Sequence, residues 1–454
     1  MRLTILGGGG FRVPLVFRAL CDNPGLGVDE LMLYDVDASR LHVVTAVLEH
    51  LASMAAQAPR VRTTTDLSEA VRGADFVFSA IRVSGLAGRI CDERAALAEG
   101  VIGQETTGAG GVCYGLRTVP EALRVAEVVT REAPSAWVIN FTNPAGMVTE
   151  AMRSHLGDRV VGICDSPVGL FRRVARALEI ELADAEFDYA GLNHLGWLRA
   201  VRIDGEDRLP ELLADSELLS RIEEGRLFGT DWLRTLGTIP NEYLWYWYYR
   251  SDALAVELAA DETRGEQILR QQRQLYAGQP EAGQPTSGGE SAYALWERTR
   301  LARESSYMAD SREVTASGER DPYDLDGGGY DQIALAVMRA VSRDEPATLV
   351  LNVANRGTFD FLDEEAVIEV PCRIDASGPH ALPVGRLDLA AQGLVTCQKA
   401  AERATIEAAS TGSRALAVKA LALHPLVGSV SVARRILERQ LAGVPELTRL
   451  LVRD

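Results

Sequence analysis

The chain has 454 residues, of which 47 are basic and 64 acidic, so its net charge is −17, and 47% of its residues are hydrophobic. The hydrophobic fraction argues against general disorder, and the length allows two domains or one large domain with its own core. The acidic excess disfavours nucleic-acid binding, because contacts to phosphates require a basic surface.

Strand and helix patterns alternate in the first third of the chain. Each expected strand is a short run of consecutive apolar residues, and residues with helical spacing follow the first two runs. Continuous apolar strands joined by helices are typical of a parallel sheet covered on both faces. We therefore expect a doubly wound, Rossmann-like α/β domain over residues 1–163. The expected strands cover residues 3–6, 31–34, 76–80, 137–140 and 160–163, and the expected helices cover 13–21 and 38–54.

The remainder of the chain, residues 164–454, has a mixed pattern, and we expect a second domain of α+β type there. Helices are expected over 166–180, over most of 208–300 and over 388–441; strands over 186–190, 195–203, 349–353 and 366–370; and a loop over 278–289. No internal repeat or long low-complexity segment interrupts this pattern.

The sequence also bears on the location of the protein. No apolar run is long enough for a transmembrane helix, and the first residues lack the apolar core of a signal peptide. We therefore expect a cytoplasmic protein without membrane attachment. The cysteines are scattered without a CxxC pair, so we expect no disulfide framework and mostly small buried thiols.

A run of four glycines lies between the first expected strand and the first expected helix: Gly7, Gly8, Gly9 and Gly10. Such a loop lets backbone amides approach a pyrophosphate at a helix N-terminus, where the helix dipole favours negative charge. Asp35 closes the next strand, where a carboxylate accepts hydrogen bonds from the adenosine ribose and favours NAD over its 2′-phosphorylated relative. The expected cofactor site also includes Phe11 and Arg12.

The alternatives at this loop stay open from the sequence alone. No third glycine follows at Arg12 or Val13, so the run could also be a flexible turn. Arg12 could pair with a phosphate or be a solvated surface charge.

Cys164 and His194 each follow a strand-like segment. A thiolate and an imidazole could share a divalent metal and leave positions open for substrate hydroxyl groups. A buried inert cysteine and a hydrogen-bonded histidine are the alternative, because cysteine is often simply buried.

Several segments together resemble the family 4 glycoside hydrolases, which are NAD- and metal-dependent glycosidases. They occur in family order over most of the chain: GGGGF, RVSGLAGRICDE (82–93), GQETTGAGG (103–111), NFTNPAG (140–146), GICDSPVG (162–169), GLNHLGW (191–197), IPNEYLWYWYY (239–249), TRGEQIL (263–269) and VIEVPC (367–372). The resemblance implies a second domain similar to the C-terminal domains of lactate and malate dehydrogenases. It also implies a homodimer or homotetramer.

The resemblance further implies a mechanism that depends on reversible oxidation. In such enzymes NAD oxidises the sugar at C3, a base removes the acidified C2 proton, and the group at C1 is eliminated. Water then adds, and the ketone is reduced again. Mn²⁺, or another divalent metal, polarises the oxygens at C2 and C3.

Site residues follow from the same resemblance, each with a plainer alternative. Cys164 and His194 would hold the metal. Tyr243 would be the base, although it could instead belong to an aromatic core face with Tyr246, Trp247 and Tyr249. Asp165 would be the acid, or the N-cap of the next helix. Glu105 would tune the surroundings of the base, or be an ordinary loop carboxylate.

The substrate would be a phosphorylated sugar glycoside. Arg89 and Asn143 match substrate-contacting positions, Arg264 matches an arginine that can hold a 6-phosphate, and Arg82 would assist. Any of these arginines could instead be a solvated charge. The aspartate at position 165 resembles the residue found in the phospho-α-glucosidase branch. The segment GLNHLGW resembles the 6-phospho-β-glucosidase branch more closely, and we favour that branch.

Other functions remain as alternatives. They are a 6-phospho-α-glucosidase, a glycosidase of unphosphorylated substrates, an NAD-dependent hydroxy-acid dehydrogenase and a non-catalytic NAD sensor.

Overall fold

The computed structural model describes residues 1–277, 291–307 and 329–453. The loop expected over 278–289 lies outside the described residues. Within these three stretches, no helix is both long and apolar enough to cross a bilayer.

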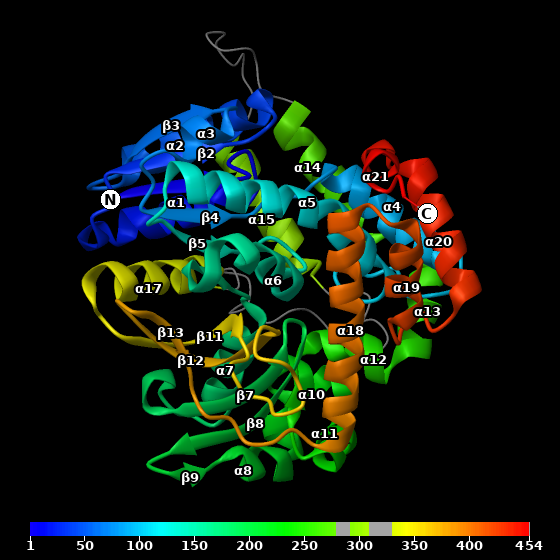
Figure 1. Cartoon of the computed structure of the whole chain (residues 1–454). Coiled ribbons are helices and arrows are strands. Elements are labelled where there is room, and N and C mark those ends of the chain that lie inside the picture. Colours follow the sequence, from blue (N-terminus) through cyan, green and yellow to red (C-terminus); the bar gives the residue numbers. More distant parts are fainter. Residues whose placement is uncertain (278–290, 308–328, 454) are drawn as a thin grey trace.

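The amino-terminal strands form the parallel part of one large sheet (Figure 1), in the order β6-β5-β4-β1-β2-β3. The five expected strands are confirmed, because their buried apolar residues face helices on both sides. The expectation missed β3, an edge strand with largely exposed side chains and no apolar run. The bounds are β1 (Arg2–Leu6), β2 (Glu30–Tyr34), β3 (Arg60–Thr64), β4 (Phe76–Ser79), β5 (Trp137–Asn140) and β6 (Val160–Gly162).

The same sheet continues in antiparallel form beyond β6. On the side away from β5, the neighbour of β6 is β11. A strand from late in the chain therefore joins the parallel part of the sheet to the antiparallel part. The order onward is β11-β12-β7-β8-β10, with β13 beside β12 and β9 beside β8. The bounds are β7 (Glu186–Leu192), β8 (Leu195–Ile203), β9 (Glu206–Asp207), β10 (Ile239–Pro240), β11 (Ala347–Ala354), β12 (Val367–Asp375) and β13 (Gly378–Ala381).

Helices cover both faces of the parallel strands. Side chains such as Ile5 and Leu33 join the core on the face of α1 and α2. Their neighbours Leu6 and Met32 join the core on the face of α3, α5 and α6. This alternation confirms the doubly wound arrangement. The bounds are α1 (Val13–Asp22), α2 (Ala38–Met54), α3 (Leu67–Val71), α4 (Gly85–Leu97), α5 (Ala109–Glu132) and α6 (Ala145–Leu156).

The remaining helices lie between residues 166 and 450. Most agree with the predicted helical patterns, but the helices over 330–343 and 445–450 lie outside every predicted range. The bounds are α7 (Ser166–Ala177), α8 (Leu209–Ala214), α9 (Ser216–Ser220), α10 (Glu223–Phe228), α11 (Thr230–Leu236), α12 (Trp245–Tyr248), α13 (Arg250–Ala259), α14 (Arg264–Ala277), α15 (Ala292–Ser305), α17 (Tyr330–Arg343), α18 (Leu389–Thr411), α19 (Arg414–Leu423), α20 (Val430–Gly443) and α21 (Pro445–Leu450).

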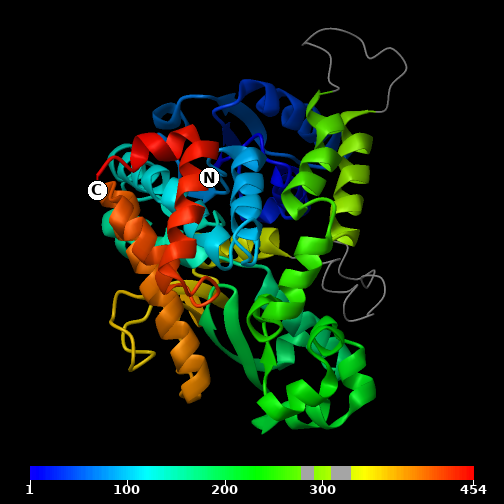
Figure 2. The ribbon, with the colours of Figure 1, turned by 90° about the vertical axis from the view of Figure 1, so that its right-hand side faces the viewer.

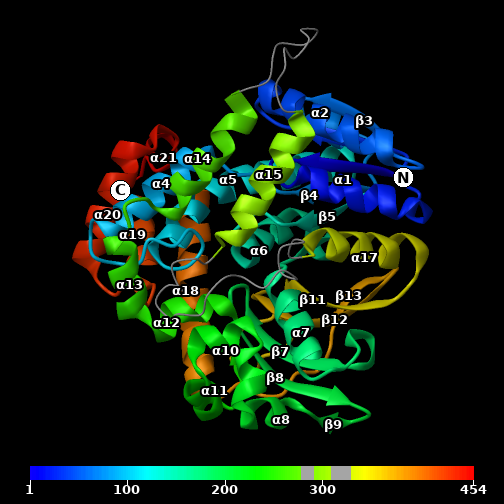
Figure 3. The same ribbon diagram turned by 180° about the vertical axis from the view of Figure 1, so that it is seen from behind.

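Several of these late helices pack on the amino-terminal half. Figure 2 shows the C-terminal helices, in orange and red, against it; α18 contacts α5, and α20 contacts α4. Seen from behind (Figure 3), α14 and α15 lie close to α4 and α2. Residues distant in sequence therefore meet around the ends of the parallel strands.

The cysteines correct one expectation. Cys113, Cys164 and Cys372 are buried, but Cys21 and Cys91 are half-buried and Cys397 is exposed, so only half of them are buried thiols. All of them are free, as expected for a chain without a disulfide framework.

Candidate active site

A cavity of about 1030 Å³ lies where the parallel strands end, which is the usual place for ligands in such a sheet. Its wall includes Asp35 after β2, Asn143 after β5 and Cys164 after β6. The other predicted residues that line it are Gly7, Gly10, Phe11, Arg12, Arg82, Arg89, Glu105, Asp165, His194, Tyr243 and Arg264. Gly8 and Gly9 are not part of this wall. Positions spread over most of the sequence thus meet at one cavity.

The glycine loop is a tight turn against the sheet. Gly7 has a left-handed φ of +84°, and a Cβ there would lie 2.5 Å from the carbonyl oxygen of Ala80. The amides of Gly7 and Gly8 both donate to the carbonyl of Tyr34, at 2.9 and 2.7 Å. The Asp35 carboxylate accepts from the amide of Gly9 at 3.0 Å. No side chain caps the start of α1, but its first amides are engaged: Val13 donates to the carbonyl of Gly10 at 3.2 Å and Leu15 to that of Arg12 at 3.1 Å, while Pro14 has no amide hydrogen.

Aromatic side chains from the second half of the chain hold this loop by its carbonyl groups. Tyr276 donates to Gly9 at 3.0 Å. Trp296 donates to the carbonyl of Phe11 at 2.9 Å, and Tyr330 to that of Arg12 at 2.9 Å. These three hydrogen bonds disfavour the flexible-turn alternative.

Arg12 and Asp165 form an ion pair with a nitrogen–oxygen distance of 3.3 Å. The Arg12 guanidinium also lies 5.1 Å from the centre of the Tyr330 ring and 5.7 Å from that of Phe141. Arg12 is therefore not simply a solvated surface charge. Asp165 occupies the N-cap position of α7, as the alternative proposed, but its side chain makes no capping hydrogen bond.

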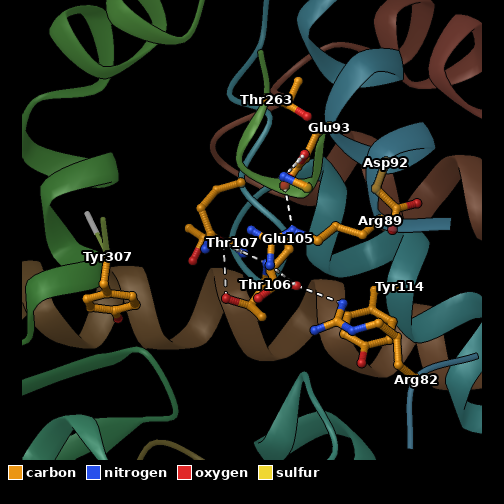
Figure 4. A network of polar contacts seen from close by, with 12 residues as sticks. Arg82, Arg89, Asp92, Glu93, Glu105, Thr106, Thr107, Tyr114, Thr263 and Tyr307 are labelled. Carbon is orange, nitrogen blue, oxygen red and sulfur yellow. Dashed lines mark hydrogen bonds and ion pairs between the residues drawn. The ribbon is translucent and has the colours of Figure 1, made fainter. Parts of the chain in front are cut away.

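Glu105 lies between two guanidinium groups, as Figure 4 shows. Its carboxylate is 2.8 Å from Arg82 and 2.9 Å from Arg89. Burial opposes ionisation, but the two arginines outweigh it and lower the pKa of Glu105 to about 2. Glu105 is thus a fixed negative charge in the cavity wall and not an ordinary loop carboxylate.

His194 lies in the turn between β7 and β8 with a left-handed φ of 62°. Its ring stacks on that of Tyr243, with centroids 3.7 Å apart, and its Nδ1 lies 2.9 Å from the hydroxyl of Thr106. Burial lowers the pKa of His194 to about 3, so the ring is neutral at pH 7. A neutral imidazole whose Nδ1 is hydrogen-bonded presents Nε2 to a metal, which is common in metal sites.

Cys164 supplies the other candidate metal donor. Burial, followed by the carboxylates of Glu369 and Asp165, raises the pKa of the Cys164 thiol well above its ordinary value. A bound cation reverses this effect, because metal binding deprotonates a coordinating thiol. The described residues contain no cluster of three or more histidine, cysteine or acidic side chains suited to a metal. The donor set nevertheless fits an ion that also binds substrate oxygens.

Tyr243 belongs to a run of aromatic residues, only some of which line the cavity. Tyr246, Trp247 and Tyr249 are partly buried and pack against the core, and Tyr249 donates its hydroxyl to the carbonyl of Phe228 at 2.5 Å. Tyr243 and Tyr246 both line the cavity, where the hydroxyl of Tyr243 lies 3.0 Å from that of Tyr307. Some aromatic residues of this run thus belong to the core, as the alternative proposed, and others belong to the site.

The start of α14 and the end of α15 each place an arginine at the cavity. Arg264 donates to the hydroxyl of Ser306 at 2.8 Å and to the carbonyl of Arg303 at 3.0 Å. The Arg303 guanidinium lies 4.6 Å from the centre of the Phe11 ring, and among the described residues it forms no ion pair. Burial and then repulsion from Arg12 and Arg264 lower the pKa of Arg303 to about 9. Such an unpaired cation suits an anionic ligand.

Some residues of this site were missed by sequence reasoning. Thr106 and Glu242 lie inside GQETTGAGG and IPNEYLWYWYY, so a signal for them existed. The other missed residues lie outside every segment used for the resemblance, and nothing in the sequence singled them out: Tyr276, Trp296, Arg303, Tyr307 and Tyr330.

Comparisons with known proteins agree with this geometry. The model of the family 4 glycosyl hydrolases matches residues 2–180, and that of the family's C-terminal domain matches residues 189–427. A protein of Bacillus subtilis named a probable 6-phospho-β-glucosidase is 31% identical over 97% of this chain and 95% of its own.

Two solved structures extend the comparison. The 6-phospho-β-glucosidase of Thermotoga maritima with manganese, NAD⁺ and glucose-6-phosphate has a TM-score of 0.81 and 28% identity, over 98% of this chain and 99% of its own. A 6-phospho-α-glucosidase from gut microorganisms with NAD and Mn²⁺ has a TM-score of 0.78 and 26% identity, over 97% of each chain. The chain belongs to the family 4 glycosyl hydrolases.

Proposed function

We propose that the protein hydrolyses 6-phospho-β-glucosides with NAD and a divalent metal ion, Mn²⁺ being the first candidate. One observation carries the proposal: the glycine loop, Cys164, His194 and Tyr243 line a single cavity. The names of the Bacillus and Thermotoga relatives support it, as do the NAD and manganese in the Thermotoga structure.

The dinucleotide lies on the glycine loop. Gly7 and Gly10 line the cavity next to its phosphates, with Phe11 and Arg12 beside them, and the dipole of α1 favours their negative charge. Asp35 keeps acceptor capacity for the ribose hydroxyls while it receives the amide of Gly9. When bound, NAD supplies reversible hydride transfer at C3, and the metal held by Cys164 and His194 stabilises negative charge on the sugar oxygens.

The other residues move protons and hold charge. Oxidation at C3 makes the C2 proton acidic, and Tyr243 removes it. Asp165 gives a proton to the oxygen that leaves C1. Glu105 fixes a negative charge near His194, held in place by Arg82 and Arg89.

The substrate carries a negative charge. Arg303 supports this, since its guanidinium lacks an ion-pair partner among the described residues and repels the neighbouring arginines. A 6-phosphate supplies the missing counter-charge. Arg89, Arg264 and Asn143 complete the substrate side of the wall, with Arg82 behind them.

A chromogenic assay tests the function and the anomer together. We expect cleavage of p-nitrophenyl 6-phospho-β-glucoside in the presence of NAD and Mn²⁺, and much weaker cleavage of the unphosphorylated and α-linked forms. Preferred cleavage of the α-linked substrate would assign the chain to the other activity of its relatives. Full activity without dinucleotide and metal would refute the mechanism.

The domain division and the assembly belong to the same proposal. Residues 1–163 hold the dinucleotide, and residues 164–454 supply the metal ligands and Tyr243. We propose a homodimer or homotetramer in the cytoplasm, in line with the family resemblance. Light scattering on the purified protein measures its mass, and a monomer at assay concentrations would contradict the assembly.

A further inference from the structure

We propose that Tyr307 and Glu242 form a proton relay behind Tyr243 and receive the proton equivalent that Tyr243 removes from C2 of the sugar. The inference rests on the proposed function, because it takes Tyr243 as the base. It adds two residues to the reaction, one of them from a segment that matches no motif.

Two hydrogen bonds connect the three residues. Tyr307 donates its hydroxyl proton to Glu242 Oε1 at 2.7 Å, because a carboxylate can only accept. The hydroxyl of Tyr307 also lies 3.0 Å from that of Tyr243, and either hydroxyl can donate across this contact. When Tyr307 gives its proton to Glu242, its oxygen accepts the proton of Tyr243, and the lone pairs of Tyr243 then face the cavity that all three residues line.

This arrangement removes a difficulty of the tyrosine base. A tyrosine with an ordinary pKa near 10 is a poor base at neutral pH. In the relay, Tyr243 takes the C2 proton while its own proton passes to Tyr307 and that of Tyr307 passes to Glu242. Tyr243 and Tyr307 are neutral before and after the step.

The step balances in atoms and charge. The C2–H bond breaks, its electron pair stays on the oxidised sugar, and Glu242 changes from carboxylate to carboxylic acid. No further oxidant or reductant is needed. When water adds to the double bond, the protons return along the same path to C2 and Glu242 is again a carboxylate.

The surroundings of Glu242 suit a temporary proton acceptor. The Glu242 side chain is buried, accepts from Ser166 at 3.2 Å, and lies 3.8 Å from Arg173. Arg173 also forms an ion pair with Glu224 and lies 4.0 Å from Glu223, so Glu242 shares this cation with two other carboxylates. Burial raises the pKa of Glu242 to about 7, Arg173 opposes this rise, and Glu223 and Glu224 add to it. Glu242 therefore takes up a proton more readily than an exposed glutamate does.

Two substitutions separate the relay from a purely positioning role. Tyr307→Phe removes the link between Tyr243 and Glu242. Glu242→Gln retains an acceptor oxygen for Tyr307 but cannot take up a proton. In both variants we expect kcat to fall about 10- to 100-fold, within the range of general-base effects, while KM and the NAD dissociation constant change less than about twofold.

The decisive measurement is the isotope effect on kcat with substrate deuterated at C2. We expect it to increase in both variants, because proton removal becomes slower than the other steps, while the effect with C3-deuterated substrate decreases. Tyr249→Phe is the matched control: it also removes a tyrosine hydroxyl bond, but Tyr249 does not line the cavity. We expect it to leave kcat and both isotope effects unchanged.

The outcomes distinguish this inference from the proposed function. A wild-type protein that fails to cleave any 6-phosphoglucoside would refute the function itself. An active wild type with an unchanged C2 isotope effect in Tyr307→Phe would refute the relay alone. A fully active Glu242→Gln variant would also refute it, since the glutamine retains the hydrogen bond but not the proton acceptor. NAD binding by each variant verifies that it is folded.

Discussion

Replacing Glu105 with glutamine tests the charge arrangement at the cavity wall. The variant keeps the shape of the side chain but removes the negative charge that lies 2.8 Å from Arg82 and 2.9 Å from Arg89. Arg89 is buried, so loss of its counter-charge leaves a cation with less compensation away from water. We expect E105Q to be less stable than the wild type at neutral pH.

The magnitude follows from the pKa of Glu105, which the two arginines lower from an ordinary 4.5 to about 2 despite burial. This difference corresponds to about 3 kcal/mol of folding free energy at pH 7. Because the folded-state pKa lies below the unfolded one, the contribution is complete above about pH 4.5. It is lost as the pH falls from there towards about 2.

Urea unfolding of both proteins at several pH values measures the effect. The free energies of unfolding should differ by about 3 kcal/mol at pH 7, and the difference should narrow below about pH 4.5. Glu127→Gln, an exposed glutamate on α5, is the matched control and should show little change at any pH. An absent difference at pH 7, or one that stays constant as the pH falls, would refute the reasoning.

Three further substitutions test the remaining assignments. Cys164→Ser should abolish metal-dependent turnover and leave NAD binding measurable by calorimetry; unchanged turnover would remove Cys164 from the site. Tyr243→Phe should lower kcat far more than it raises KM in steady-state kinetics, and a normal kcat would exclude it as the base. Arg303→Met should raise KM for the phosphorylated substrate about tenfold or more, in line with the loss of a charge-assisted hydrogen bond, and Arg303→Lys should restore part of it. An unchanged KM would show that Arg303 does not bind the phosphate.

The fold and much of the cavity wall could be predicted from local patterns. The strands before Gly7 and Asp35 are continuous apolar runs, and the sheet buries them on both faces. Parallel strands place their carboxyl ends at one edge, so residues that follow such strands converge there even when far apart in sequence. Asn143 and Cys164 reach the cavity in this way.

Long-range contacts could not be predicted from the same patterns. The polar edge strand β3 has no apolar run, and the pairing of β6 with β11 joins segments distant in the chain. Asp165 precedes a helix and therefore resembled an N-cap, but its side chain pairs with Arg12. A propensity describes the residue and its neighbours, whereas this ion pair depends on where a loop 153 residues earlier comes to lie.

The helix α15 shows most clearly why a segment without a motif can still shape the site. Trp296 holds the carbonyl of Phe11 at 2.9 Å, Arg303 lies over the Phe11 ring at 4.6 Å, and Tyr307 just beyond the helix bonds to Tyr243 at 3.0 Å. A helix fixes the spacing of its residues, so a displacement of α15 moves its contacts with the dinucleotide loop and with the base together. The loop that would carry the cofactor and the tyrosine that would remove the proton are therefore positioned by one rigid element. Their geometry depends on its packing, and no local sequence pattern records that packing.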